Sequence, residues 1–154
     1  MSDTAAPTQS LPESEVARIG KALVNDIPDA VIYVDPDNII RLWNAGATRL
    51  FGFSASEAVG RSLDIIIPER LRKRHADGFR HMMKTGQRRH KADEVLSVPA
   101  LNKAGETLSI QFTVAAVTNN DRSVAGIVAV LRDATQTFRE LKRLRSLVSE
   151  PSRS

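Results

Sequence analysis

The sequence predicts an α+β domain in which a five-stranded antiparallel sheet carries helices on one face, with a further helix flanking each end. Five runs rich in β-branched and apolar residues, two early and three late, are separated by clusters of turn-forming residues. Helical periodicity lies between the two groups and at both ends of the chain. The 154 residues, 42% of them hydrophobic and 26% charged, suit one globular domain.

The N-terminal region is expected to contain a disordered stretch followed by a helix. Residues 1–9 are small and polar, whereas Ser10–Glu13 offers a capping box with a proline in the first helical turn. A flanking helix is therefore predicted over residues 10–27, ending before Pro28. Its apolar positions recur at helical spacing: Val16, Ile19, Leu23, Val24 and Ile27.

The central domain is predicted over residues 28–135 and begins with a β-hairpin. Ala30–Val34 and Ile39–Trp43 are strand-like runs separated by the turn formers Asp35–Asn38. Asn44 and Ser54 are placed to cap two short helices after the hairpin.

A long helix and three strands complete the predicted domain. Pro68 is suited to a helix start, the helical period holds from Glu69 to Thr85, and Gly86 is suited to end it. Three antiparallel strands are expected after that helix, over Val95–Leu101, Thr107–Val117 and Ser123–Leu131.

The C-terminal helix is predicted over residues 136–149 and is followed by a tail, 150–154. Its apolar spacing of 4, 3 and 4 residues is a fragment of a heptad pattern, too short for a stable coiled coil alone. We therefore expect a signalling helix that supports a homodimer. The residues concerned are Thr137, Leu141, Leu144 and Val148.

Several classes of chemistry are excluded or lack candidate residues. The absence of cysteine excludes disulfides, thiolate metal sites, a cysteine nucleophile and photochemistry that traps a flavin on a thiol. No phosphate-binding glycine loop, GxSxG motif or HExxH motif is present, so we expect no enzyme. No signal peptide and no apolar run of about 20 residues is found, which predicts a cytoplasmic protein without membrane insertion.

The segment from Arg70 to Lys91 is strongly basic. It contains nine of the 22 cationic residues but one of the 18 acidic ones, Asp77. The simplest interpretation is a solvated helix face, and contact with an acidic partner is the alternative. The segment has no interleaved aromatic residues and no helix-turn-helix pattern, which argues against nucleic acid.

The order of the predicted elements, together with several motifs, resembles the PAS family of sensor domains. The resemblance covers about residues 26–135 and implies a domain that senses ligands, cofactors or partners and signals through its terminal helices. The matching segments are Ile27–Ile32, Trp43–Ala47, Leu50–Phe53, Glu57–Ser62, Ile67–Glu69, Lys103–Glu106 and Leu131–Thr135.

His75 lies on the apolar stripe of the predicted long helix. At 100° per residue, Leu71, Phe79 and Met82 fall within about 40° of it and Gly78 within about 60°. A glycine inside a helix costs about 1 kcal/mol relative to alanine, so its position beside His75 indicates a need for space. The pattern predicts that His75 faces the sheet.

The same position resembles the proximal iron ligand of haem-containing PAS oxygen sensors. The resemblance implies haem b as the cofactor and His75 as the ligand to its iron. The departure is on the strand after the helix, where Asp93–Val98 lacks the arginine or methionine usual on the distal side. The alternative is a histidine that forms a hydrogen bond within the core. The pocket would be lined by Leu71, Gly78, Phe79, Met82, Val95, Leu96, Val98, Ile110 and Phe112.

Two functions therefore remain open at the level of sequence. The first is a sensory module that binds haem or a small ligand between the long helix and the sheet. The second is a cofactor-free interaction or dimerisation domain that docks a signalling kinase or a transcriptional regulator. Because one fold serves many functions, the choice depends on the site.

Overall fold

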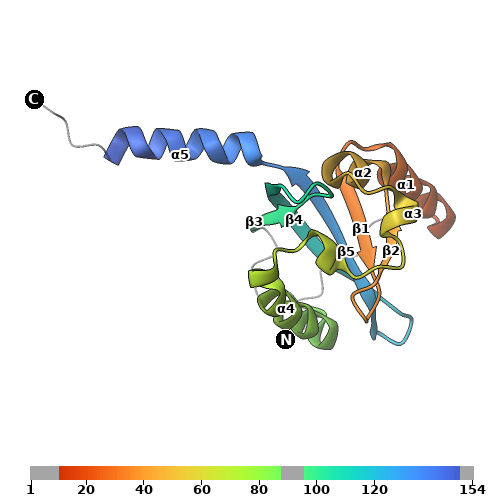
Figure 1. The fold of residues 1–154 in the computed structure, drawn as a ribbon. Helices are drawn as coiled ribbons and strands as arrows, with labels where there is room; N and C mark the ends of the chain where they lie inside the picture. Colours follow the sequence, from red (N-terminus) through yellow and green to blue (C-terminus); the bar gives the residue numbers. More distant parts are fainter. Residues whose placement is uncertain (1–10, 88–95, 150–154) are drawn as a thin grey trace, which may run out of the picture.

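The computed structural model describes residues 11–87 and 96–149, and five strands within them form one antiparallel sheet (Figure 1). The strand order is β2-β1-β5-β4-β3, so the early hairpin and the three late strands meet where β1 pairs with β5. The predicted α+β class and the five-stranded sheet are confirmed. The strands are β1 (Ala30–Val34), β2 (Ile40–Trp43), β3 (Leu96–Leu101), β4 (Thr107–Thr118) and β5 (Val124–Asp133).

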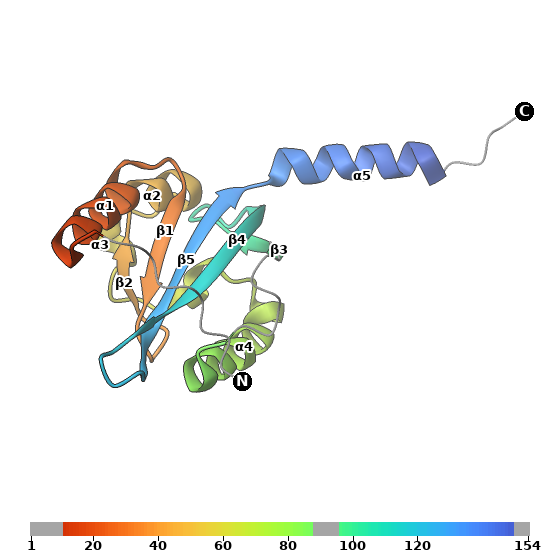
Figure 2. The same ribbon diagram turned by 180° about the vertical axis from the view of Figure 1, so that it is seen from behind.

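The short helices and α4 pack on the inner face of the sheet, whereas α5 projects away from the domain (Figures 1 and 2). The predicted regions 1–9 and 150–154 lie outside the described residues. The helices are α1 (Glu13–Asp26), α2 (Ala45–Phe51), α3 (Ala55–Ala58), the 3-10 turns η1 (Leu63–Ile66) and η2 (Glu69–Leu71), α4 (Arg72–Thr85) and α5 (Thr135–Ser149).

The core lies between the inner face of the sheet and α2 to α4. Ile32, Ile40 and Phe51 are its largest fully buried side chains. Trp43 lies between the rings of Phe51 and Phe53, and its Nε1 donates to the Phe53 carbonyl at 3.0 Å. The only tryptophan of the chain is thereby fixed in both packing and hydrogen bonding.

Local side-chain chemistry sets the ends of the short elements. Asn44 caps α2 through the amide of Ala47, and Ser54 and Glu57 form a capping box on α3. Both predicted caps are confirmed. Gly86 ends α4 in the left-handed conformation at φ 69°, as predicted for a glycine at this place.

Two helix starts differ from the sequence-based expectation. The predicted long helix begins as the 3-10 turn η2, in which the Leu71 amide donates to Pro68, and α-helical geometry starts at Arg72. The flanking helix begins at Glu13, with Pro12 in the cap position and no side-chain cap. Ser10 of the expected capping box lies outside the described residues.

Both flanking helices expose apolar side chains. Val16, Ile19 and Leu23 of α1 are each about half exposed, and α1 buries no residue completely. The α5 helix exposes a longer set: Phe138, Leu141, Leu144, Leu147 and Val148. Among the described residues, no helix has the combination of length and apolarity needed to cross a bilayer.

Candidate ligand site on the long helix

The α4 helix divides cleanly into a face toward the sheet and a face toward solvent. Met82 is buried in the core cluster, and Phe79 packs against that cluster from the neighbouring turn. Lys73, Arg74 and Lys84 are exposed on the other side. The helix therefore presents apolar side chains, with His75 between them, to the interior.

The imidazole of His75 is the one titratable group of α4 on that inner side. Its ring stacks on Phe79, with centroids 6.3 Å apart and planes inclined by 20°. Its Nδ1 is buried and has no hydrogen-bond partner among the described residues. A buried polar atom without a partner is costly, and among the described side chains the only other one is Oδ1 of Asn38.

Burial also keeps this imidazole neutral. Loss of solvation lowers the pKa of His75, and the carboxylate of Asp64 in η1 opposes the shift without reversing it. The neutral ring is the form that can bind a metal ion. Asp64 had no signal in the sequence, because it belongs to a separate apolar run and approaches His75 only in the folded chain.

The structure places the remaining predicted pocket residues unevenly. Ile110 is buried, and Leu71 and Phe112 are half-buried against the core cluster. Val98 pairs with Ile110 in register and yet keeps 36% of its surface exposed. Leu96 begins β3 opposite Phe112, and Val95 lies outside the described residues.

Gly78 is open on the side where a side chain would stand. A methyl group placed there would meet no described atom within 4 Å. Leu71, by contrast, belongs to η2 and not to the α-helix, so its predicted angle to His75 does not apply. The structure thus shows open space beside Gly78 and an uncovered surface on Val98.

The donor set near His75 suits haem better than a bare metal ion. Among the described residues there is no group of three or more histidines, cysteines or carboxylates that could hold a metal. Haem iron needs only one or two protein ligands, because the porphyrin supplies four nitrogens. One neutral imidazole among apolar side chains fits that requirement.

Two shallow surface pockets lie away from α4. One, of about 340 Å³, lies between the end of α2 and the β3–β4 turn, and its walls include Leu50, Gly52 and Lys103. The other, of about 250 Å³, lies between α2 and the ends of β1 and β5, beside Asp29 and Arg132. Neither is lined by a residue of the predicted pocket.

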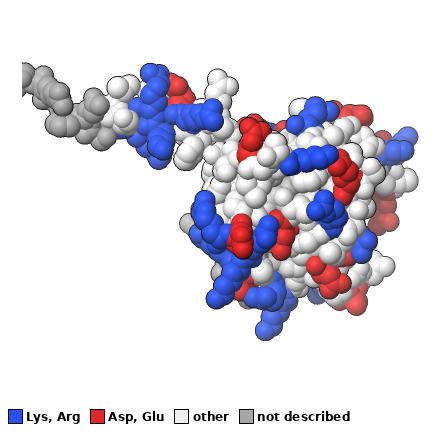
Figure 3. All heavy atoms as spheres, in the orientation of Figure 1, with Lys and Arg blue, Asp and Glu red and all other residues white. Residues whose placement is uncertain are grey.

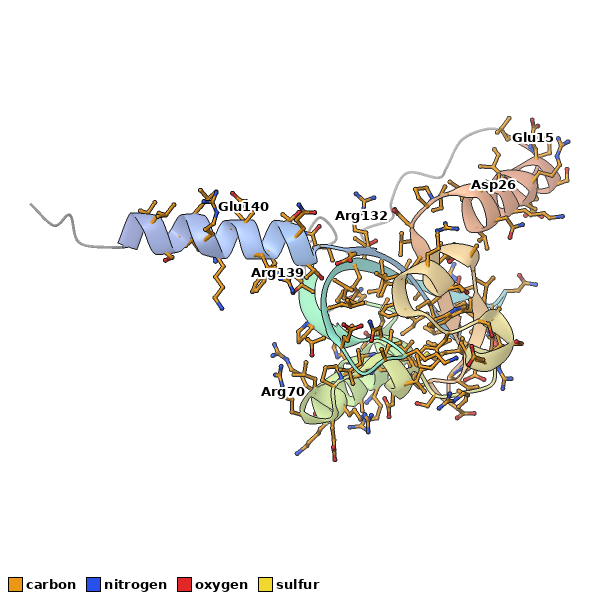
Figure 4. All side chains as sticks on the ribbon, turned by 45° about the horizontal axis from the view of Figure 1, so that its top comes forward. Glu15, Asp26, Arg70, Arg132, Arg139 and Glu140 are labelled. Atoms are coloured by element: carbon orange, nitrogen blue, oxygen red, sulfur yellow. The ribbon has the colours of Figure 1, made fainter. Side chains whose placement is uncertain are left out.

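The exit toward α5 is tied to the sheet by polar contacts. The Asp133 carboxylate accepts from the Thr135 amide at 2.8 Å, and the Thr135 hydroxyl accepts from the Ser109 amide at 3.0 Å. Arg132, labelled in Figure 4, donates to Asp29 at 2.8 Å and so joins the end of β5 to the chain entering β1. Asp133 thus accepts a hydrogen bond from the first residue of α5.

Comparison with known proteins places this architecture in a family. The PAS fold model matches residues 18–134. The chain is 30% identical over 134 residues to sensor protein FixL of Bradyrhizobium diazoefficiens, and 25% identical over 146 residues to oxygen sensor protein DosP of Escherichia coli. These matches cover 86% and 95% of this chain but 26% and 17% of those proteins, so the chain spans about a quarter of their length or less.

Solved structures show the same fold. The PAS domain of a protein from Colwellia psychrerythraea has a TM-score of 0.69 at 18% identity, with 79% of this chain and 98% of that chain covered. An RNA-binding light-oxygen-voltage receptor has a TM-score of 0.73 at 22% identity, with 96% of this chain and 41% of that chain covered. With its sheet order, its helices and the family match in agreement, the chain belongs to the PAS family.

Proposed function

We propose that this PAS module binds haem b through His75 and passes the state of that site to its terminal helices. The observation that carries the proposal is the buried Nδ1 of His75, which has no hydrogen-bond partner among the described residues. The similarity to a sensor protein and to an oxygen sensor protein supports the same function.

The chain's own residues would hold the cofactor by one polar and several apolar contacts. His75 would provide a neutral imidazole, and burial maintains that protonation state at physiological pH. Phe79, Met82 and Ile110 would pack against the macrocycle, because they form the apolar inner faces of α4 and β4. Bound haem would supply an iron that can change its oxidation state or bind a diatomic gas.

The test is the absorbance of purified protein after haem supplementation. A Soret band is expected for the unaltered chain and its loss for His75→Ala. The matched control is His81→Ala, because His81 is on the same helix about 120° away from the His75 direction. The haem proposal fails if the unaltered chain takes up no haem, or if His75→Ala and His81→Ala keep equal bands.

A second candidate is a cofactor-free dimerisation module that docks a signalling kinase or regulator. The apolar residues exposed on α1 and α5 favour it. In a parallel α5 pair, Leu141 and Leu144 would occupy core heptad positions, and Glu140 of one copy would face Arg145 of the partner copy. The homodimer, the docking role and a cytoplasmic location are parts of this proposal.

Light scattering on a gel-filtration column separates the two candidates. A dimer is expected for the unaltered chain and a monomer for Leu141→Asp, while Lys142→Asp, which changes the outer surface of α5, should remain dimeric. A dimer that persists in haem-free His75→Ala supports the docking role. A monomer at all concentrations excludes the dimerisation module.

A further inference from the structure

The outer face of α4 is a continuous basic surface. At 100° per residue, five basic residues and Asp77 fall within a sector about 120° wide, opposite His75 and Met82. This sector, here called the basic stripe, runs for about 16 Å along the helix axis. Its basic members are Lys73, Arg74, Arg80, His81 and Lys84.

Most of the stripe's charge has no partner within the domain. Arg80 forms an ion pair with Asp77, but Lys73, Arg74 and Lys84 have no hydrogen bond or ion pair with any described residue. Arg72, which belongs to another side of the helix, instead donates to the carbonyls of Ile67 and Asp64. Arg72 therefore anchors α4, whereas Lys73, Arg74 and Lys84 have no partner in the part of the chain that the structure describes.

The stripe is visible as a local feature of the surface. Figure 3 shows a group of lysine and arginine side chains over α4, with a few acidic side chains among them. Arg70, in the preceding turn η2, points outward in Figure 4 and has no ion pair with any described residue. Like charges held together without counter-charges repel one another, so an anionic partner would be stabilising.

We propose that the basic stripe docks an acidic helical segment of a partner protein. Carboxylates at every third or fourth residue of such a helix would meet the stripe over about three turns, because both helices have about 3.6 residues per turn. The inference is independent of the cofactor, since the stripe lies on the face opposite His75. It assigns α4 two roles, one on each face.

Two features of the stripe favour protein over nucleic acid or lipid. Asp77 stands among the cations and would repel any anion placed over it. A helical peptide can leave an uncharged residue opposite Asp77, whereas a nucleic-acid backbone carries a charge on every nucleotide. Phe79 and Met82 of α4 pack with the core, so the stripe offers no apolar anchor, and its one ring is the imidazole of His81. What remains is complementary charge, which sets encounter rate and specificity.

The test measures anisotropy of a fluorescent helical peptide of about 18 residues with glutamates along one face. The test variant is Lys73→Glu, Arg74→Glu and Lys84→Glu combined. The matched control reverses three exposed cations on α1 and α2, Arg18, Lys21 and Arg49, and has the same net charge. Circular dichroism and thermal unfolding verify that both variants fold.

We expect the stripe variant to lose at least about tenfold in affinity and the control to stay within about twofold. Binding should also weaken as salt rises from about 0.05 to 0.5 M. Equal losses in both variants would mean that net charge alone acts, and would overturn the proposal. Tighter binding of an RNA duplex or of phosphatidylserine vesicles, lost in the stripe variant, would assign the stripe to those partners instead.

Discussion

Asn44 is the residue whose replacement tests the architecture most directly. Its side chain is 7% exposed and makes four hydrogen bonds. Its Oδ1 accepts from the amides of Val31 and Ala47 at 2.8 and 2.9 Å, and its Nδ2 donates to the carbonyls of Val24 and Asp29 at 2.8 and 3.0 Å. One amide thus joins α1, β1 and α2.

Asn44→Ala should destabilise the domain by about 3 kcal/mol. Four hydrogen bonds at about 0.5–1.5 kcal/mol each would give a total of about 2–6 kcal/mol, and water that enters to replace them reduces the loss. For a chain of this length that corresponds to a melting temperature about 6–12 °C lower. Urea unfolding followed by the fluorescence of Trp43, the neighbouring buried ring, measures the change.

Asn44→Asp separates the cap from the two donated bonds. The aspartate keeps the acceptor for Val31 and Ala47 but sets a second oxygen against two carbonyls. Because burial beside carbonyls raises the pKa of that carboxyl, the variant should recover stability relative to the unaltered chain as pH falls. In both variants the amides of α1 should exchange faster, since α1 loses the bond at Val24. An alanine variant within about 1 kcal/mol of the unaltered chain would refute the reasoning.

Two further predictions concern backbone fit and pH. Gly46→Ala should lower the urea midpoint strongly, because the added Cβ would lie 2.2 Å from the Asp29 carbonyl oxygen; Gly78→Ala, in open space, is the control and should be neutral or slightly stabilising. In the haem-free protein, stability should decrease as pH falls below about 6.5, because burial lowers the pKa of His75 in the folded state and the unfolded chain then binds the proton more readily. His75→Gln should flatten that slope, whereas Glu57, whose pKa Lys103 lowers to about 2, acts only below about pH 4.5. An unchanged slope in His75→Gln would show that other groups cause it.

Local features were predictable because neighbouring residues determine them. The Asp35–Asn38 turn, the caps at Asn44 and Ser54 and the stop at Gly86 each depend on side chains within a few residues of the backbone they satisfy. Helical periodicity likewise separated the two faces of α4. The sequence alone therefore located His75 on the inner side of the long helix.

Long-range features had no such signal. The bonds from Asn44 to Val24 and Asp29 span 20 and 15 residues, and the Arg132–Asp29 pair spans 103. Asp64 reaches His75 only because η1 turns back toward α4. Val98 lies opposite Ile110 and so belongs to the inner face of the sheet, yet it is exposed. Its exposure depends on what covers the edge of the sheet, and the alternation of apolar and polar residues along one strand does not predict that.

The strand β5 connects the candidate site to the segments where α1 and α5 join the sheet. Its first residue, Val124, lies beside Gly86 at the end of α4. Its central residues pair with β1 on one side and β4 on the other, and its last residues hold Asp29 and cap α5. A displacement of α4 would therefore act on a strand that is paired on both sides, has a register shift near Gly126 and ends at Asp133, just before α5. The Arg132–Asp29 pair is exposed and contributes at most about 1 kcal/mol. The end of β5 can therefore separate from the chain entering β1 before the pairing between the strands breaks.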